Sequence, residues 1–90
     1  MWPDGSCDPD AYAQAQRCLQ IIEQALVEAG VTLAHVVRTR MYIVDADDAG
    51  AVGRAHGGVF ADVWPAATMV VVKGLLDPRW KVEIEAEAQA

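Results

Sequence analysis

Residues 80–89, WKVEIEAEAQ, alternate between polar and apolar side chains almost without a break. Successive side chains of a β-strand point to opposite faces of a sheet, so this period of two predicts a strand. One face carries charged residues and the other apolar ones: Lys81, Glu83, Glu85 and Glu87 against Val82, Ile84, Ala86 and Ala88. Neighbouring carboxylates repel one another, so the charged face requires water, cations on an adjacent strand or a partner subunit.

Two more segments have the β-branched and aromatic composition of strands. In residues 36–44 the alternation separates two faces: Arg38, Arg40 and Tyr42 on one, and Val37, Thr39, Met41 and Ile43 on the other. Residues 66–74 are so apolar that we expect this strand to be covered on both faces.

Residues 7–30 have helical spacing. Asp8 can cap this helix, Pro9 suits its first position and Gly30 suits its end. Apolar residues recur every three or four positions and predict one buried stripe: Tyr12, Ala15, Leu19, Ile22, Leu26 and Ala29.

Residues 45–64 predict a second helix, capped by Asp45 or Asp47. Its stripe comprises Val52, Ala55, Val59, Phe60 and Val63. Each interior glycine costs about 1 kcal/mol relative to alanine, so packing must hold this helix, and we expect the glycines to allow a close backbone approach.

The order helix, strand, helix, strand, strand predicts an α+β fold with two helices on one face of a small mixed sheet. We expect a single domain over residues 1–90, with residues 1–8 as an N-terminal loop. A sheet face that carries arginines and glutamates cannot be a dry core within one subunit. We therefore expect an oligomer that covers this face.

Composition narrows the possible partners. Thirteen acidic and seven basic residues give a formal net charge of −6, which repels phosphate backbones and argues against nucleic acid as a partner. No apolar run approaches the roughly 18 residues of a membrane helix, and the first residues lack the features of a secretion signal, so we expect a cytoplasmic protein without a membrane partner. Cys18 falls on the first helix stripe and suits a buried thiol, whereas His35 and His56 stand apart from other metal ligands and predict no metal site.

The ordered blocks QIIEQALVEAGVTLAHVVRTRMYIVDADD, AVGRAHGGVF, PAATMVVVKGLL and VEIEAEA resemble the reactive intermediate deaminase family, also called RidA or YjgF-like. The resemblance runs from about Asp8 to the C-terminus. It implies a chorismate-mutase-like fold and a homotrimer with small-molecule clefts between subunits. It also implies hydrolysis of enamine and imine intermediates to a keto acid and ammonia, without metal or cofactor.

In the mechanism that this resemblance implies, an arginine after Pro-Ala binds the substrate carboxylate, and a glutamate in the last strand activates water. Ala67 stands at the arginine position, and Glu83 is retained as the candidate catalytic residue. Gly53 replaces a frequent asparagine, while Ala67 and Met69 would line the former pocket with apolar surface. The family's strand pair before the first helix would be absent, because Met1 falls in the loop that follows it.

Three functions remain open from the sequence. The leading hypothesis is a RidA-like small-molecule-binding protein with weak or no deaminase activity. The second is a hydrolase that uses Glu83 on an atypical substrate. The third is an oligomeric scaffold or regulatory module. Arg38 and Arg40 can either bind a carboxylate in place of the lost arginine or neutralise the glutamates across the sheet, and we expect the latter.

Overall fold

The computed structural model describes residues 5–90, in which two α-helices cover a three-stranded sheet. The bounds of the elements are α1 (Ala11–Glu28), β1 (Val36–Ile43), α2 (Ala49–Phe60), β2 (Ala66–Val71) and β3 (Val82–Ala88). Single 3-10 turns at Leu33–His35 and Ala46–Asp48 precede β1 and α2. The predicted order of elements is confirmed. Residues 5–10 contain no strand.

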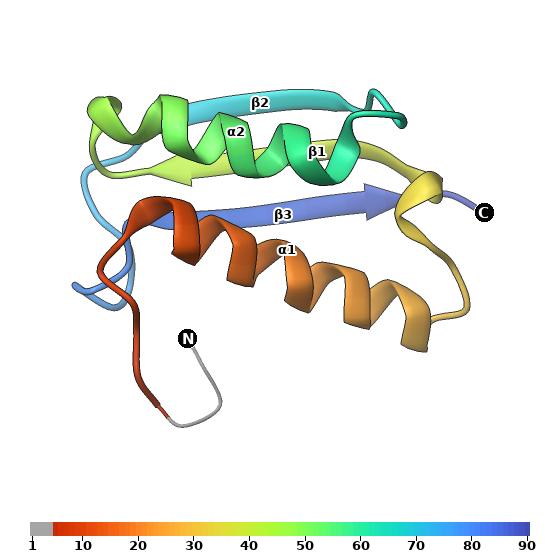
Figure 1. Ribbon diagram of the computed structural model, residues 1–90, viewed down its shortest axis with the longest axis horizontal. Coiled ribbons are helices and arrows are strands. Elements are labelled where there is room, and N and C mark those ends of the chain that lie inside the picture. Colours follow the sequence, from red (N-terminus) through yellow and green to blue (C-terminus); the bar gives the residue numbers. More distant parts are fainter. Residues whose placement is uncertain (1–4) are drawn as a thin grey trace.

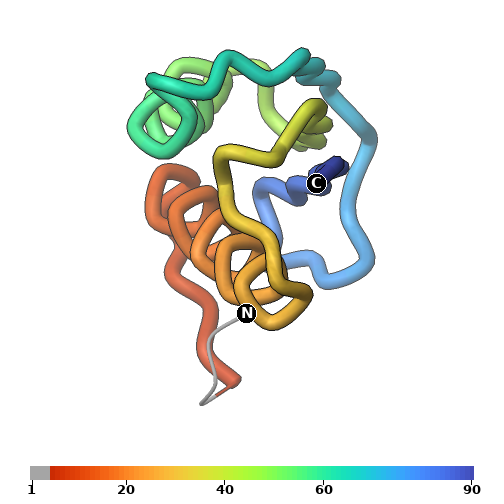
Figure 2. The backbone as a smooth tube through the Cα atoms, turned by 90° about the vertical axis from the view of Figure 1, so that its right-hand side faces the viewer, coloured from red at the N-terminus to blue at the C-terminus, as the bar shows by residue number. Residues whose placement is uncertain are grey.

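The sheet is mixed, with the strand order β2-β1-β3. The central strand β1 runs parallel to β2 and antiparallel to β3. Figure 1 shows both helices on the same side of the sheet, and the end-on view in Figure 2 shows that the opposite side is open. The predicted α+β architecture, with two helices on one face of a mixed sheet, is therefore confirmed.

The core lies between this sheet and the two helices. The largest side chains that are completely enclosed are Leu19 of α1, Val52 of α2, and Ile43 and Thr39 of β1. The buried residues Leu19 and Val52 belong to the stripes that the spacing predicts, whereas Ala29 at the end of the first stripe is exposed. Helix α1 packs against both β3 and α2.

The ends of α1 follow from local hydrogen bonding. The carboxylate of Asp10 accepts a hydrogen bond from the Ala13 backbone N–H at 3.0 Å, so Asp10 is the N-cap. The predicted cap, Asp8, instead accepts from the Asp10 backbone N–H at 2.9 Å, and this turn delays the start of the helix. The predicted stop is confirmed, because Gly30 has φ +83° just beyond the helix.

A β-bulge changes the predicted faces at the start of β1. The register with β3 shifts between Val36 and Arg38, so Val37 is the extra residue. Val36 is buried, whereas Val37, which alternation alone assigned to the core, is 44% exposed. The bulge moves one apolar residue onto the surface without changing the faces of the rest of the strand.

Two packing expectations are wrong for this chain. The strand β2 is an edge strand that pairs only with β1, and its side chains are exposed except for the half-buried Met69, so it is not covered on both faces. The glycines of α2 do not allow a close backbone approach within the described residues. A Cβ added at Gly53, Gly57 or Gly58 would meet no atom within 4 Å.

Within residues 5–90, neither helix combines the length and the hydrophobicity needed to cross a membrane.

Candidate functional site

The open face of the sheet carries the charged ladder of β3 beside the arginines of β1. Arg40 Nη1 lies 2.9 Å from Glu87 Oε1 and 3.5 Å from Glu85 Oε1, and the Tyr42 hydroxyl donates to Glu85 Oε1 at 2.7 Å. The hydrogen bond to Glu87 raises the pKa of Arg40, and the hydrogen bond to Glu85 raises the pKa of Tyr42. The predicted neutralisation of the glutamates is thus confirmed for Arg40, whose guanidinium is already occupied.

Glu83 differs from the other two glutamates. It is exposed and lies opposite Tyr42 in the β1–β3 register, on the same open face. Within residues 5–90 its carboxylate has no ion-pair partner, whereas Glu85 and Glu87 share Arg40. Of the three carboxylates on β3, Glu83 is therefore the one without a cationic partner among the described residues.

Ala67 and Met69 lie on the other side of the sheet. The register of the parallel pair places Ala67 beside Thr39 and Met69 beside Met41, and both of these β1 residues are buried under the helices. Residues paired across neighbouring strands point to the same face, so Ala67 and Met69 face the helix layer at its edge. Ala67 is exposed there, which leaves room for a longer side chain.

A single chain therefore does not bring Ala67 and Glu83 together. They belong to the two outer strands, with β1 between them, and they point to opposite faces of the sheet. Arg40 lies on the face of Glu83 and not on that of Ala67. A ligand that touches both positions must be enclosed by more than one subunit.

The polar contact nearest to Ala67 in the register is a hydrogen bond of 2.8 Å between Thr39 Oγ1 and His56 Nε2. The His56 ring also lies against Phe60, with 4.8 Å between ring centroids. Partial burial lowers the pKa of His56, so its imidazole is neutral near pH 7. Alternation placed Thr39 on the buried face, and a buried hydroxyl needs a hydrogen-bond partner, but the sequence did not identify His56 as that partner.

Gly53 lies one helical turn before His56 on α2 and is exposed. A Cβ added at Gly53 would meet no atom of residues 5–90 within 4 Å. Beyond α2, Trp64 is 87% exposed and adopts φ 55° before Pro65. Gly53 thus adds no polar side chain here, in keeping with the expected loss of polarity at this position, and Trp64 adds exposed apolar surface between α2 and β2.

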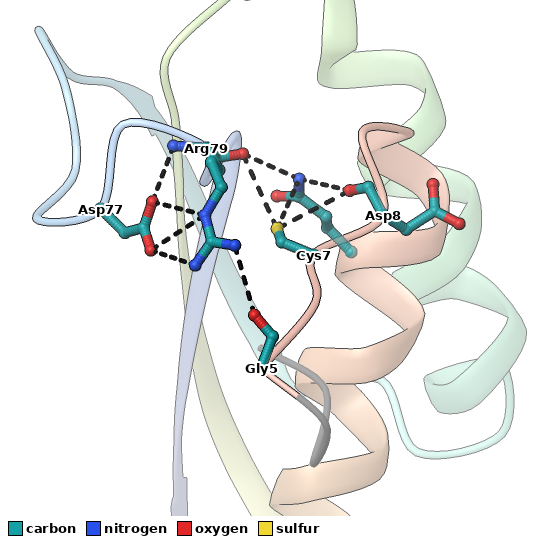
Figure 3. A network of polar contacts seen from close by, with 6 residues as sticks. Gly5, Cys7, Asp8, Asp77 and Arg79 are labelled. Carbon is teal, nitrogen blue, oxygen red and sulfur yellow. Dashed lines mark hydrogen bonds and ion pairs between the residues drawn. The ribbon is translucent and has the colours of Figure 1, made fainter.

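Sequence reasoning missed a second polar group, centred on the buried Gln14 of α1. Its Nε2 donates to the carbonyl oxygens of Asp8 at 2.7 Å and Arg79 at 3.0 Å, and its Oε1 accepts from the Lys81 backbone N–H at 2.7 Å. Figure 3 shows the surrounding contacts, in which Arg79 also pairs with Asp77 and donates to Gly5. Gln14 lies three residues after Ala11 and four before Cys18, beside the apolar stripe, and this helical spacing is the signal that could have predicted a buried contact.

This arrangement defines a class: an α+β subunit of chorismate-mutase-like fold whose candidate site is split between two faces of its sheet. Residues 3–90 match the sequence profile described as endoribonuclease L-PSP. The chain belongs to this family, which is also called the YjgF or Rid family.

Two curated relatives are more than a third identical to this chain over the aligned residues. An uncharacterized protein of Streptomyces coelicolor is 38% identical over 79 residues, which are 88% of this chain and 59% of that protein. The mitochondrial protein mmf1 of Schizosaccharomyces pombe is 34% identical over 77 residues, which are 86% of this chain and 48% of that protein. The chain thus spans less than two thirds of the length of either relative.

Solved structures agree with this assignment. A Mycobacterium tuberculosis member of the YjgF/YER057c/UK114 family is 42% identical, with a TM-score of 0.91 over 94% of this chain and 72% of that one. A Rid family protein of Yersinia pestis is 27% identical, with a TM-score of 0.88 over 93% of this chain and 67% of that one.

Proposed function

We propose that this chain is a small-molecule-binding Rid protein with weak or no 2-imino acid deaminase activity, working as a homotrimer whose clefts lie between subunits. The observation that carries this proposal is that residue 67, which pairs with Thr39 in the register, is an alanine and supplies no positive charge on this side of the sheet. On that side of the sheet the nearest polar contact in the register is the neutral pair of His56 and Thr39.

A bound carboxylate needs a positive partner in such a cleft. Arginine is suited to this role because its planar fork makes two parallel hydrogen bonds to a carboxylate, and removing a buried charged partner weakens binding by about 2–5 kcal/mol. Arg40 is a poor substitute, since Glu85 and Glu87 already hold its guanidinium on the other face. The cleft should therefore favour a neutral small molecule, bound without a cofactor.

The family's description as an endoribonuclease suits this chain less well. A formal net charge of −6 repels the phosphate backbone, and three of the glutamates that contribute to it lie on the exposed face of β3. Charge therefore supports a small-molecule ligand rather than RNA.

One observation favours a second candidate function. Glu83 lacks an ion-pair partner among the described residues, so its carboxylate is free to orient water. A hydrolase that acts on an imine or enamine without the usual carboxylate would need only this group and a shaped cleft.

Hydrolysis of 2-aminoacrylate, generated in the assay and followed as pyruvate, tests the first function. The purified chain should give a rate close to that without protein. Rapid pyruvate formation would contradict the proposal. Rapid formation that Glu83→Gln abolishes would establish the hydrolase instead.

A further inference from the structure

The open face of the sheet, on the side away from the helices (Figure 2), presents three rows of side chains that cross the strands. Residues paired across neighbouring strands point to the same face, so the register defines each row. From one end of the face to the other, the rows are Ala66, Arg38 and Glu87; Thr68, Arg40 and Glu85; and Val70, Tyr42 and Glu83. The face therefore combines uncharged side chains on β2 with two cations on β1 and three anions on β3.

Charge compensation within one chain leaves one cation and one anion of this face over. Glu85 and Glu87 both lie within ion-pair distance of Arg40, at 3.5 and 2.9 Å. Arg38 lies directly opposite Glu87 in the register, yet its guanidinium makes no ion pair within residues 5–90. Glu83 makes none there either, and both side chains are exposed. Arg38 and Glu83 are therefore the residual charges of the face.

The residual charges lie at opposite ends of the face. Glu83 precedes Glu87, the residue opposite Arg38, by four positions on β3. At about 3.3 Å per residue the two positions are about 13 Å apart along the strand, and Arg40 lies between them with the glutamates that it binds. Lys81 precedes Glu83 by two residues but also makes no ion pair among the described residues. Neither residual charge thus has a partner in its own chain.

An interface on this face takes the residual charges out of water. A buried charge without a partner destabilises an interface, whereas a complementary charge across it fixes the register and excludes wrong partners. The face also offers apolar surface to an interface, because Val70 of β2 is 42% exposed there. A second copy of the chain complements both features, since it brings the same apolar strand together with residual charges of both signs.

We propose that, in the assembled protein, Arg38 of each chain forms an ion pair with Glu83 of the neighbouring copy. This inference rests on the proposed homotrimer and deepens it, because each candidate site then contains a side chain from a second chain. The pair compensates the one carboxylate of β3 that has no cationic partner in its own chain. Arg38 is thus a positioning residue for the Glu83 carboxylate, and the neutral pair agrees with a cleft that favours a neutral ligand.

The test reverses both charges and measures, by sedimentation at low ionic strength, the concentration at which the assembly dissociates. Arg38→Glu and Glu83→Arg each place like charges opposite one another across the interface, so each should raise this concentration about tenfold or more. The double variant, Arg38→Glu with Glu83→Arg, restores opposite charges between copies. It should return the dissociation concentration to within about threefold of that of the unaltered chain.

Matched controls reverse charges on the helices, where Arg54 of α2 and Glu23 of α1 are exposed. Arg54→Glu and Glu23→Arg make the same changes in net charge and should leave dissociation unchanged. If a charge reversal prevents folding, Arg38→Gln and Glu83→Gln measure the same coupling, because together they should weaken assembly less than the product of their separate effects.

The outcomes separate this ion pair from the homotrimer itself. Rescue of assembly by the double variant supports the pair, because a reversal at one position is then compensated by a reversal at the other. An assembled chain whose reversals at Arg38 and Glu83 behave like the controls, or whose double variant is no better than the single ones, would overturn the pair and leave the trimer standing. Independent effects of the two glutamine variants would overturn it as well. An unaltered chain that is monomeric would overturn both proposals.

Discussion

Thr39 and His56 show how one buried hydroxyl shapes the site. Thr39 is completely enclosed, so its Oγ1 needs a partner within the protein, and His56 provides it at 2.8 Å. The contact orients the imidazole beside the β2 edge that carries Ala67. His56 therefore binds the β1 residue that pairs with Ala67, the position at which the family resemblance implies an arginine.

Replacing His56 by Gln tests the protonation state of this ring. The lowered pKa means that unfolded His56, with its ordinary pKa of 6.5, takes up a proton at a higher pH than folded His56. The free energy of unfolding should therefore be fully retained above pH 6.5 and should fall as the pH drops through 6.5 toward the folded pKa. Solvent reaches the ring, so the fall should be a fraction of the about 1.4 kcal/mol that one pKa unit represents.

Urea denaturation at about pH 7.5 and about pH 5 measures this difference. His56→Gln keeps a hydrogen-bonding group near Thr39 but does not titrate, so its unfolding free energy should depend less on pH. All other ionisable groups are the same in both proteins, so their contributions cancel in the comparison. Identical pH dependence of the two proteins would contradict a neutral folded His56.

At the residue scale, the sequence predicts which side of an element a side chain occupies better than it predicts its polar partner. The separation of Glu83 from Ile84 follows from alternation alone, and the pairing of Arg40 with the glutamates follows from the need to compensate charge. Gln14 has contacts with residues 65 to 67 positions away in the sequence, so no local pattern could identify its partners.

The two helices illustrate the balance between local propensity and packing. Helix α2 has a low intrinsic helix propensity and is held by its buried stripe, chiefly Val52, Ala55 and Phe60. A Cβ added at its glycines 53, 57 or 58 would meet no atom of the described residues within 4 Å. The structure gives no packing reason within this chain for those glycines. In α1, by contrast, Gly30 has a left-handed conformation that ends the helix.

This contrast predicts opposite effects of the same substitution. Gly57→Ala should raise the free energy of unfolding by about 0.5–1 kcal/mol, because it removes unfolded-state entropy in a helix with room for a methyl group. Gly30→Ala should lower it by about 1–2 kcal/mol, because φ +83° is unfavourable for alanine. Urea unfolding of both variants checks this, and a destabilised Gly57→Ala would show that the space is occupied in the assembled protein.

At the element scale, periodicity predicts every helix and strand that residues 5–90 contain, because each element has a continuous apolar face. It fails at Val37, where one inserted residue changes the period, and at β2, whose edge position depends on strand order. Neither a bulge nor a strand order is encoded in local alternation.

For the whole molecule, the open sheet face is the surface that the proposed trimer would bury. Its apolar part includes Val70, which is 42% exposed and pairs with Tyr42 on that face. The chain should therefore have a solution mass near three times 9.7 kDa. Val70→Asp should shift this mass toward the monomer in sedimentation experiments, because it introduces a charge into the interface.

A matched control is Leu76→Asp, because Leu76 is 94% exposed in the loop after β2 and away from the sheet face. It should leave the mass unchanged. A monomeric unaltered chain, or equal masses for the two variants, would argue against an interface on this face.

The central claim is that residue 67 decides whether this chain can bind and hydrolyse an anionic imine. The most direct measurement is the rate of 2-aminoacrylate hydrolysis by Ala67→Arg, with Ala67→Lys and the unaltered chain beside it. Our account predicts that the arginine variant is at least tenfold faster than the unaltered chain, equivalent to about 1.4 kcal/mol, and that lysine gives a smaller gain because it lacks the planar fork. Equal rates for all three proteins, or an unaltered chain as fast as the arginine variant, would contradict it.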